Sequence, residues 1–68
     1  MSRLLTPGQR IKMRLMKLDM TETELAEKIG MDPAHLLYIM NGQMTADASQ
    51  KTDISHALGL KEKAIWKH

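Results

Sequence analysis

Residues 21–42, TETELAEKIGMDPAHLLYIMNG, place the start and stop signals of two short helices in one stretch of the chain. Thr21 and Glu24 form a capping box: the Thr21 hydroxyl can accept from the N–H three residues on, and the Glu24 carboxylate can reach back to the Thr21 backbone. Gly30 suits the left-handed C-terminal cap that ends a helix. The first half of the stretch therefore predicts a short helix that closes at a tight turn.

The second half of the stretch predicts another helix directly after the turn. Asp32-Pro33 supplies an N-cap and a proline at the first helical position, where its missing N–H costs nothing. Asn41-Gly42 supplies the stop signal. On the buried side of this helix we expect Leu36, Ile39 and Met40.

Helix signals continue before this stretch, and strand signals are nearly absent from the whole chain. Thr6-Pro7 has the form of an N-cap followed by proline at the first helical position. Ile11, Leu15 and Leu18 then follow at spacings of four and three, which is one stripe of a helix. These residues predict a first helix that buries this stripe.

Two further helices are expected after a polar loop at residues 43–48. The fourth helix is expected over residues 48–58, with Ile54, Ala57 and Leu58 facing inward. A short fifth segment over residues 61–66 offers Ala64, Ile65 and Trp66 to close the core. The predicted fold is all-α, a compact five-helix bundle that forms one domain over residues 1–68.

Composition limits how such a chain can be stabilised. Its 68 residues suffice for one small domain, near the lower end of what folds without cross-links. The chain has no cysteine, which excludes disulfides and thiolate metal sites, and its seven methionines suit gap-filling in an aliphatic core. No apolar run approaches the ~20 residues of a membrane span, and no signal peptide is evident. We therefore expect a cytoplasmic protein with no membrane contact.

The net charge of +2 is spread unevenly along the chain. Residues 1–20 carry a net +4, residues 21–48 a net −4 and residues 49–68 a net +2. The basic N-terminal part could face a phosphate backbone. Charge alone favours the simpler interpretation, in which these residues form solvated helix faces.

Four positions decide how the two helices of the 21–42 stretch pack. Ala26 is small enough for a close approach of the helices, and Gly30 supplies the positive φ of the turn. Leu36 and Ile39 then pin the second helix across the first. This spacing is the layout of a helix-turn-helix at about residues 21–42.

Together with the later ISHALGL, the stretch resembles the helix-turn-helix family of the phage lambda and 434 repressors and Cro proteins, the XRE type. The shared pattern is a capped T-x-x-x-L-A-x-x-x-G helix, a second helix with Leu36 and Ile39 inward, a closing N-G, and a later A-L-G-apolar segment. The resemblance covers roughly residues 8–66. It implies a lambda repressor-like DNA-binding domain, double-stranded DNA as partner and no cofactor.

The resemblance also implies which residues contact DNA. It places Pro33, Ala34 and Tyr38 at base edges, with Leu37 close by. Near phosphates it places Thr21, Glu22 and the 41–45 segment, from which we expect contacts by Asn41, Gln43 and Thr45. To these we add Arg10 and His35, because their side chains can bond a phosphate oxygen.

The chain departs from the family pattern in three places, of which the first two bear on DNA contact and the third on the fold. Glu22 stands where members often have Gln, and a carboxylate repels a phosphate. The 43–48 loop has no cation, although it is often basic in the family. Leu15 and Met40 stand where some members have an Arg–carboxylate pair. Replacing both partners by apolar residues is physically consistent, because a single remaining partner would be a buried unpaired charge. With no Arg or Gln on the reading helix, we expect weaker, more AT-dependent recognition.

The resemblance implies a sequence-specific transcriptional regulator. With one domain, we expect a Cro-like phage or prophage repressor, associated with the bacterial nucleoid, that binds a pseudo-palindromic operator as a homodimer. The alternative is a protein-interaction module, or an antitoxin of the same fold, that contacts a protein partner through Leu37 and Tyr38.

An enzyme is not expected from this sequence. No nucleophile–base arrangement, phosphate-binding loop or cofactor motif is present, and no catalytic residue is assigned. The three histidines lack the spacing of metal ligands, so no metal site is assigned either.

Overall fold

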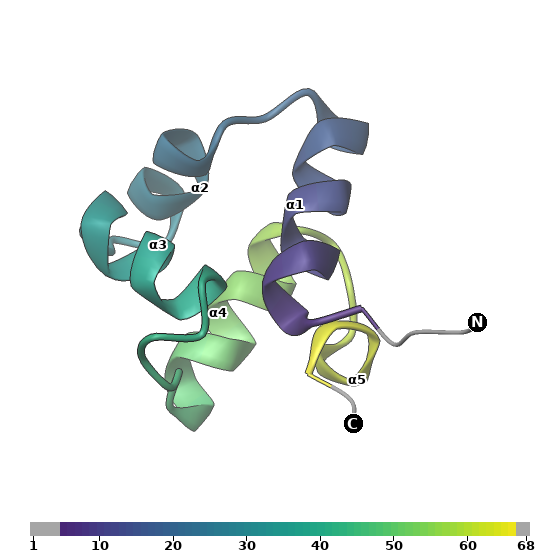
Figure 1. The fold of residues 1–68 in the computed structure, drawn as a ribbon. Coiled ribbons are helices and arrows are strands. Elements are labelled where there is room, and N and C mark those ends of the chain that lie inside the picture. The colour runs from purple at the N-terminus through teal and green to yellow at the C-terminus, as the bar shows by residue number, and fades with distance from the viewer. Residues whose placement is uncertain (1–4, 67–68) are drawn as a thin grey trace.

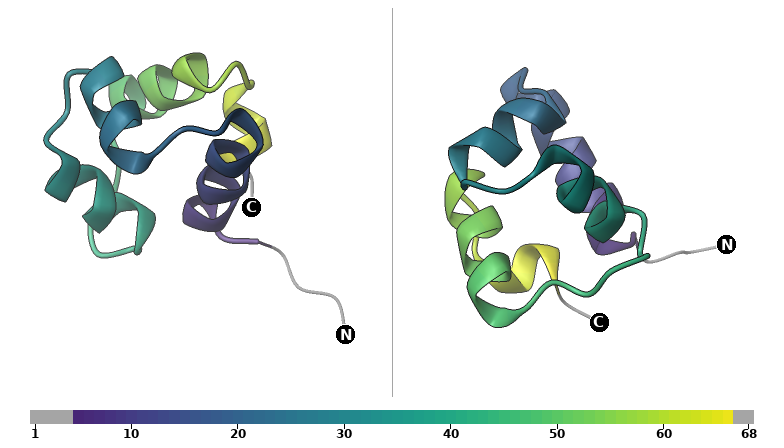
Figure 2. Two further views of the ribbon diagram at one scale, coloured as in Figure 1. Left: turned by 90° about the horizontal axis from the view of Figure 1, so that it is seen from above. Right: turned by 90° about the vertical axis from the view of Figure 1, so that its left-hand side faces the viewer.

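The computed structural model describes residues 5–66, which form five helices around one core (Figures 1 and 2). In chain order the helices are α1 (Pro7–Leu18), α2 (Glu22–Lys28), α3 (Pro33–Met40), α4 (Ala48–Ala57) and α5 (Glu62–Ile65). No strand occurs in the described part of the chain, so the predicted all-α, five-helix fold is confirmed. Figure 1 shows α2 and α3 on one side of the molecule and α1 and α5 on the other.

Capping boxes start three of the helices. At α2, the Glu24 N–H donates to the Thr21 hydroxyl (3.1 Å) and the Thr21 N–H donates to the Glu24 carboxylate (2.8 Å), as predicted. The same reciprocal bonds join Thr6 with Gln9 at α1 and Asp47 with Gln50 at α4, where the sequence had not suggested them. Each box satisfies two backbone N–H groups that would otherwise lack a partner.

The core contains one or two aliphatic side chains from every helix. Its fully buried members are Ile11, Leu15, Leu25, Ala26, Leu36, Ile54, Leu58 and Ile65. Half-buried methionines, among them Met20, Met31 and Met40, pack against this cluster. The predicted inward faces of α2, α3 and α4 are thereby confirmed in outline.

Two of the predicted core positions are wrong. Leu18 is 40% exposed, because α1 ends there and Asp19 reverses the chain with a φ of 56°. Met20, just beyond this turn, packs against the core instead. Ala64 is exposed as well, since α5 has only four residues and Ile65 takes the inward position.

The buried Ser55 of α4 is hydrogen-bonded to Trp66, which follows α5. The Ser55 hydroxyl donates to the Lys51 carbonyl (2.8 Å) and accepts from the Trp66 indole N–H (3.2 Å). The Lys51 ammonium lies 5.7 Å from the centre of the Trp66 ring, within cation–π range. This arrangement holds Trp66 and α5 against α4.

Gly8 lets α1 approach α3 closely. A Cβ at Gly8 would lie only 1.8 Å from the Met40 carbonyl oxygen, so no larger residue fits there without a backbone shift. Leu15 and Met40, at the positions of the family's charged pair, both pack in the core. The contact between α1 and α3 is therefore apolar and tight, and it fixes the position of α3.

Candidate nucleic-acid interface

The turn between α2 and α3 has the hydrogen bonds of a Schellman motif. The Met31 N–H donates to the Ala26 carbonyl (2.8 Å), and the Gly30 N–H donates to the Glu27 carbonyl (3.2 Å). Gly30 adopts a φ of 69°, and nothing lies within 4 Å of a Cβ built there. Glycine is therefore favoured by conformation rather than by space, as the sequence predicted.

Helix α3 presents its predicted base-reading side to solvent. Leu36 and Ile39 are buried, which turns the opposite face outward: Leu37 is 41% exposed and Tyr38 is 49% exposed. Pro33 and Ala34 are exposed at the start of the helix, where the Asp32 carboxylate accepts from the Ala34 N–H (3.0 Å). Positions 33, 34, 37 and 38 share one side of a helix. The structure thus brings all four residues to one surface.

Several residues predicted to contact phosphate lie at the two ends of the α2–α3 unit. Thr21 is exposed and precedes α2, whereas Glu22 is half-buried in its first turn. The Thr21 oxygen accepts the capping bond, so its hydroxyl hydrogen remains available to a phosphate oxygen. His35, on α3 between these ends, is half-buried.

The loop after α3 supplies the other predicted phosphate contacts. Asn41, Gln43 and Thr45 are all exposed. The N–H groups of Gln43 and Met44 both donate to the Tyr38 carbonyl (2.8 and 3.2 Å), which ties the loop to the reading helix. These amide and hydroxyl side chains are therefore held beside the exposed face of α3.

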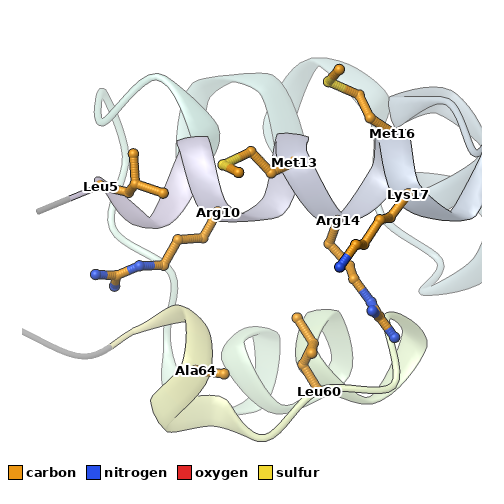
Figure 3. Close-up of a pocket in the computed structure, with 8 residues that line it drawn as sticks. All are labelled: Leu5, Arg10, Met13, Arg14, Met16, Lys17, Leu60 and Ala64. Atoms are coloured by element: carbon orange, nitrogen blue, oxygen red, sulfur yellow. The ribbon is translucent and has the colours of Figure 1, made fainter.

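Arg10 lies apart from this group. Its Nη1 donates to the Ile65 carbonyl (3.0 Å), and its side chain lines a groove between α1 and α5 (Figure 3). Arg14 is placed similarly, with Nε donating to the Leu58 carbonyl (3.0 Å). These two arginines tie α1 to the C-terminal part of the chain, and a phosphate contact by Arg10 stays a prediction.

Lys51 is a candidate contact that the sequence had not singled out. Although no cation occurs in residues 43–48, Lys51 lies in the first turn of α4 and lines a hollow of about 300 Å³ together with Asn41 and Thr45. The expected start of the fourth helix at residue 48 already placed Lys51 in its first turn, but only the fold shows that this turn lies beside the loop after α3. Lys51 thus brings a positive charge to the side of the loop where phosphate contacts are expected.

Comparison with known protein families decides the class of this protein. A family model described as helix-turn-helix matches residues 11–65, which is most of the chain. The chain belongs to this helix-turn-helix family. It is accordingly a DNA-binding transcriptional regulator of the XRE type, its partner is double-stranded DNA, and the family is regulatory rather than enzymatic. No curated protein sequence and no solved structure matches the chain.

The described residues of the helix-turn-helix protein contain neither a candidate metal site nor a candidate membrane-spanning helix. Within residues 5–66, no three His, Asp or Glu side chains are grouped so that they could hold a metal ion. Over the same range, none of the helices has both the length and the apolar character to span a membrane.

Proposed function

We propose that this helix-turn-helix protein is a Cro-like phage or prophage repressor, a single domain over residues 1–68 that binds a pseudo-palindromic operator as a homodimer. The observation that carries the proposal is the outward side of α3, where Pro33, Ala34, Leu37 and Tyr38 form one accessible surface. Repression would follow from occlusion, because two reading helices in successive major grooves block polymerase from the same DNA.

Base reading by this surface would be largely apolar. Ala34 and Leu37 can pack against thymine methyl groups, and the Tyr38 hydroxyl can bond a base edge or a phosphate. The four proposed base-reading residues include no Arg or Gln, so the bidentate contacts worth about 1–3 kcal/mol each are not available from them. The proposal therefore includes an AT-rich half-site of modest specificity.

Phosphate contacts would position α3 in the groove. On one side of the groove we assign Thr21, and on the other Asn41, Gln43 and Thr45, with Lys51 adding charge. Glu22 opposes this binding, because its carboxylate would face the phosphate backbone.

Dimerisation is assigned to the loop before α4. Ile65 is fully buried and closes the core of one chain, so its side chain is not available to a second copy. Met44 in the loop is 43% exposed and borders the hollow lined by Met40 and Trp66, so its side chain offers an apolar contact to a second copy. A dimer of this kind would place its two α3 helices about 34–36 Å apart, one turn of DNA.

Selection of binding sites from random duplex DNA, followed by affinity measurements on two leucine variants, tests the proposal. Leu37→Ala should weaken binding to the selected operator by about tenfold, or about 1.4 kcal/mol, because it removes apolar contact area at the thymine methyl groups. Leu18→Ala is the matched control, because Leu18 is 40% exposed and Leu37 is 41% exposed. Equal affinities of the two variants, or a strongly specified GC-rich half-site, would contradict the proposed reading.

A second candidate function is a protein-interaction module or an antitoxin of the same fold. It is favoured by the exposed Leu37 and Tyr38 together with the acidic residues of the 21–48 segment. Binding to random duplex DNA separates the two functions, since phosphate contacts give a measurable affinity at low salt that falls as the salt concentration rises. No measurable binding at low salt, combined with loss of a protein complex in Leu37→Ala, would support this second function.

A further inference from the structure

An open groove of about 650 Å³ runs between α1 and the segment leading into α5 (Figure 3). We call it the α1–α5 groove; it is lined by Leu5, Arg10, Met13, Arg14, Met16, Lys17, Leu60 and Ala64. A second hollow continues it past α5, where Lys61 and Lys63 join Arg10, Leu60 and Ala64. Basic side chains on the α5-facing side of the groove adjoin the apolar side chains of Met13 and Met16, which lie farther out on α1 (Figure 3).

The groove lies away from the surface proposed to read DNA. Figure 1 shows α5 and α2–α3 on opposite sides of the molecule, and none of the residues lining the groove belongs to α2 or α3. A regulator bound to DNA through α3 would therefore leave this groove accessible.

Two methionines give the groove its apolar character. Met13 is 56% exposed and Met16 is 73% exposed, and both lie on the outer side of α1, whose inner side buries Ile11 and Leu15. Leu5, also exposed, extends the patch toward the start of α1. Methionine side chains adapt to differently shaped apolar partners, and grouped exposed apolar residues mark protein-interaction surfaces.

The charges on the groove all have one sign. Arg14 is fixed by its bond to the Leu58 carbonyl, which occupies a donor but leaves the positive charge in place. Lys17 extends from α1 toward the α5 segment (Figure 3), and Lys61 and Lys63 line the hollow that continues the groove. None of the described residues that line the groove or its continuation is acidic.

We infer that the α1–α5 groove binds an acidic amphipathic helix of a partner protein. The apolar stripe of that helix would pack on Met13 and Met16, and its acidic residues would face the basic side chains of the groove. In helix-in-groove recognition the apolar face of a helix packs on exposed apolar side chains, and complementary charges beside them add specificity. The inference does not depend on how α3 reads DNA.

Two other occupants fit these observations less well. A second copy bound through a twofold axis would place this basic groove against its identical counterpart, and the like charges would repel. A nucleic acid would match the basic side chains, but its phosphate backbone would leave the methionine surface without an apolar partner.

Synthetic peptides provide the probe. The test peptide has about 15 residues, enough to form a helix when bound, with leucines at i, i+3, i+4 and i+7 and glutamates on both flanks. One control peptide has the same composition with the leucines spread around the helix, and another has the stripe with lysine in place of glutamate. Binding to the full 68-residue chain is followed by fluorescence anisotropy and by NMR of the methionine methyl groups. We expect only the striped acidic peptide to bind and to shift the Met13 and Met16 signals.

Matched variants then locate the site. The double variant Met13→Gln with Met16→Gln should weaken peptide binding by about tenfold, since it removes the apolar anchor, while Leu18→Gln, at an exposed residue of α1 that does not line the groove, leaves binding unchanged. Lys17→Gln should reduce the affinity and its salt dependence, whereas Lys28→Gln on α2 should do neither. All five replaced side chains are exposed, so the variants should keep the fold, and circular dichroism checks this.

Four results would overturn the inference. The striped acidic peptide could fail to bind, or the two acidic peptides could bind equally, which would reduce the groove to a charged surface. Duplex DNA could shift the Met13 and Met16 signals, which would make the groove a nucleic-acid surface. Self-association lost in the double methionine variant would assign the groove to a second copy.

Discussion

Gly8 is the residue at which α1 and α3 come closest. A Cβ there would lie 1.8 Å from the Met40 carbonyl oxygen, and that neighbour is backbone that cannot rotate away. Helix propensity alone predicts that replacing a glycine inside a helix with alanine raises the free energy of unfolding by about 1 kcal/mol. The close contact with Met40 predicts instead that alanine at position 8 makes the protein less stable.

We expect Gly8→Ala to lower the free energy of unfolding by about 1–3 kcal/mol, the usual cost of overpacking a filled site. Urea denaturation followed by circular dichroism measures this change. Ser49→Ala, an exposed replacement in the first turn of α4, is the control and should stay within about 0.5 kcal/mol of the parent protein. A stabilised Gly8→Ala variant would show that the two helices do not meet as described.

Glu22 is the residue that most opposes the proposed DNA contact. Glu22→Gln should raise the affinity for duplex DNA by about fivefold, because it removes a repulsion and adds a donor worth about 0.5–1.5 kcal/mol. Fluorescence anisotropy with a labelled duplex measures the change, and Glu27→Gln, which alters an exposed carboxylate later in α2, is the control. An unchanged affinity for Glu22→Gln would mean that Glu22 does not approach a phosphate.

At the scale of elements, α5 depends on α4 for its position. With only four residues, α5 is far too short to be stable by itself. Ile65 packs in the core, and the Trp66 indole N–H donates to the Ser55 hydroxyl. The Ser55 side chain is therefore a main connection between the two elements.

We expect Ser55→Ala to destabilise the protein by about 1–3 kcal/mol, since it leaves the partly buried Trp66 N–H without its acceptor. Trp66 is the one tryptophan in the chain, so its fluorescence reports on this junction. In Ser55→Ala, the Trp66 emission should change at a lower urea concentration than the helical signal in circular dichroism. Coincident transitions at the parent midpoint would show that Ser55 does not hold α5.

At the scale of the whole molecule, the charge distribution separates two surfaces. The acidic 21–48 segment contains α2 and α3, whereas Arg14, Lys17 and Lys61 line the α1–α5 groove or its continuation. On α2 and in the first turn of α4, the described cations are Lys28 and Lys51. A DNA complex formed through α3 should thus release few counterions.

This arrangement predicts a shallow salt dependence for duplex binding. With about two cations per chain near the DNA, the slope of log K against log salt should be about −2 per chain, or about −4 for a dimer. Anisotropy titrations between about 50 and 200 mM salt measure it. A much steeper slope would mean that α1 or the groove also faces the phosphate backbone. If DNA binds at α1 or the groove, Lys17→Gln should reduce the slope. If DNA binds through α3, Lys17→Gln should leave the slope unchanged.

The ends of the helices and the fold class could be predicted from the sequence. The Thr21–Glu24 capping box, the turn at Gly30 and the Asp32 N-cap depend on hydrogen bonds that reach only two to five residues along the chain, so short motifs fix them. The spacing of Leu25, Ala26, Leu36 and Ile39 likewise predicted which sides of α2 and α3 are buried. The four positions on α3 that we propose to read bases follow from that periodicity together with the family resemblance.

Only the tertiary structure decided how the helices meet. Arg14 bonds the Leu58 carbonyl across 44 positions and Arg10 bonds the Ile65 carbonyl across 55, and Gly8 contacts Met40 on another helix. The exposure of Leu18, Met13 and Met16 has the same origin, since periodicity shows that a helix has an apolar side but not which neighbour covers it. Local hydrogen bonds thus determined the elements, and contacts between distant residues decided the surfaces that they present.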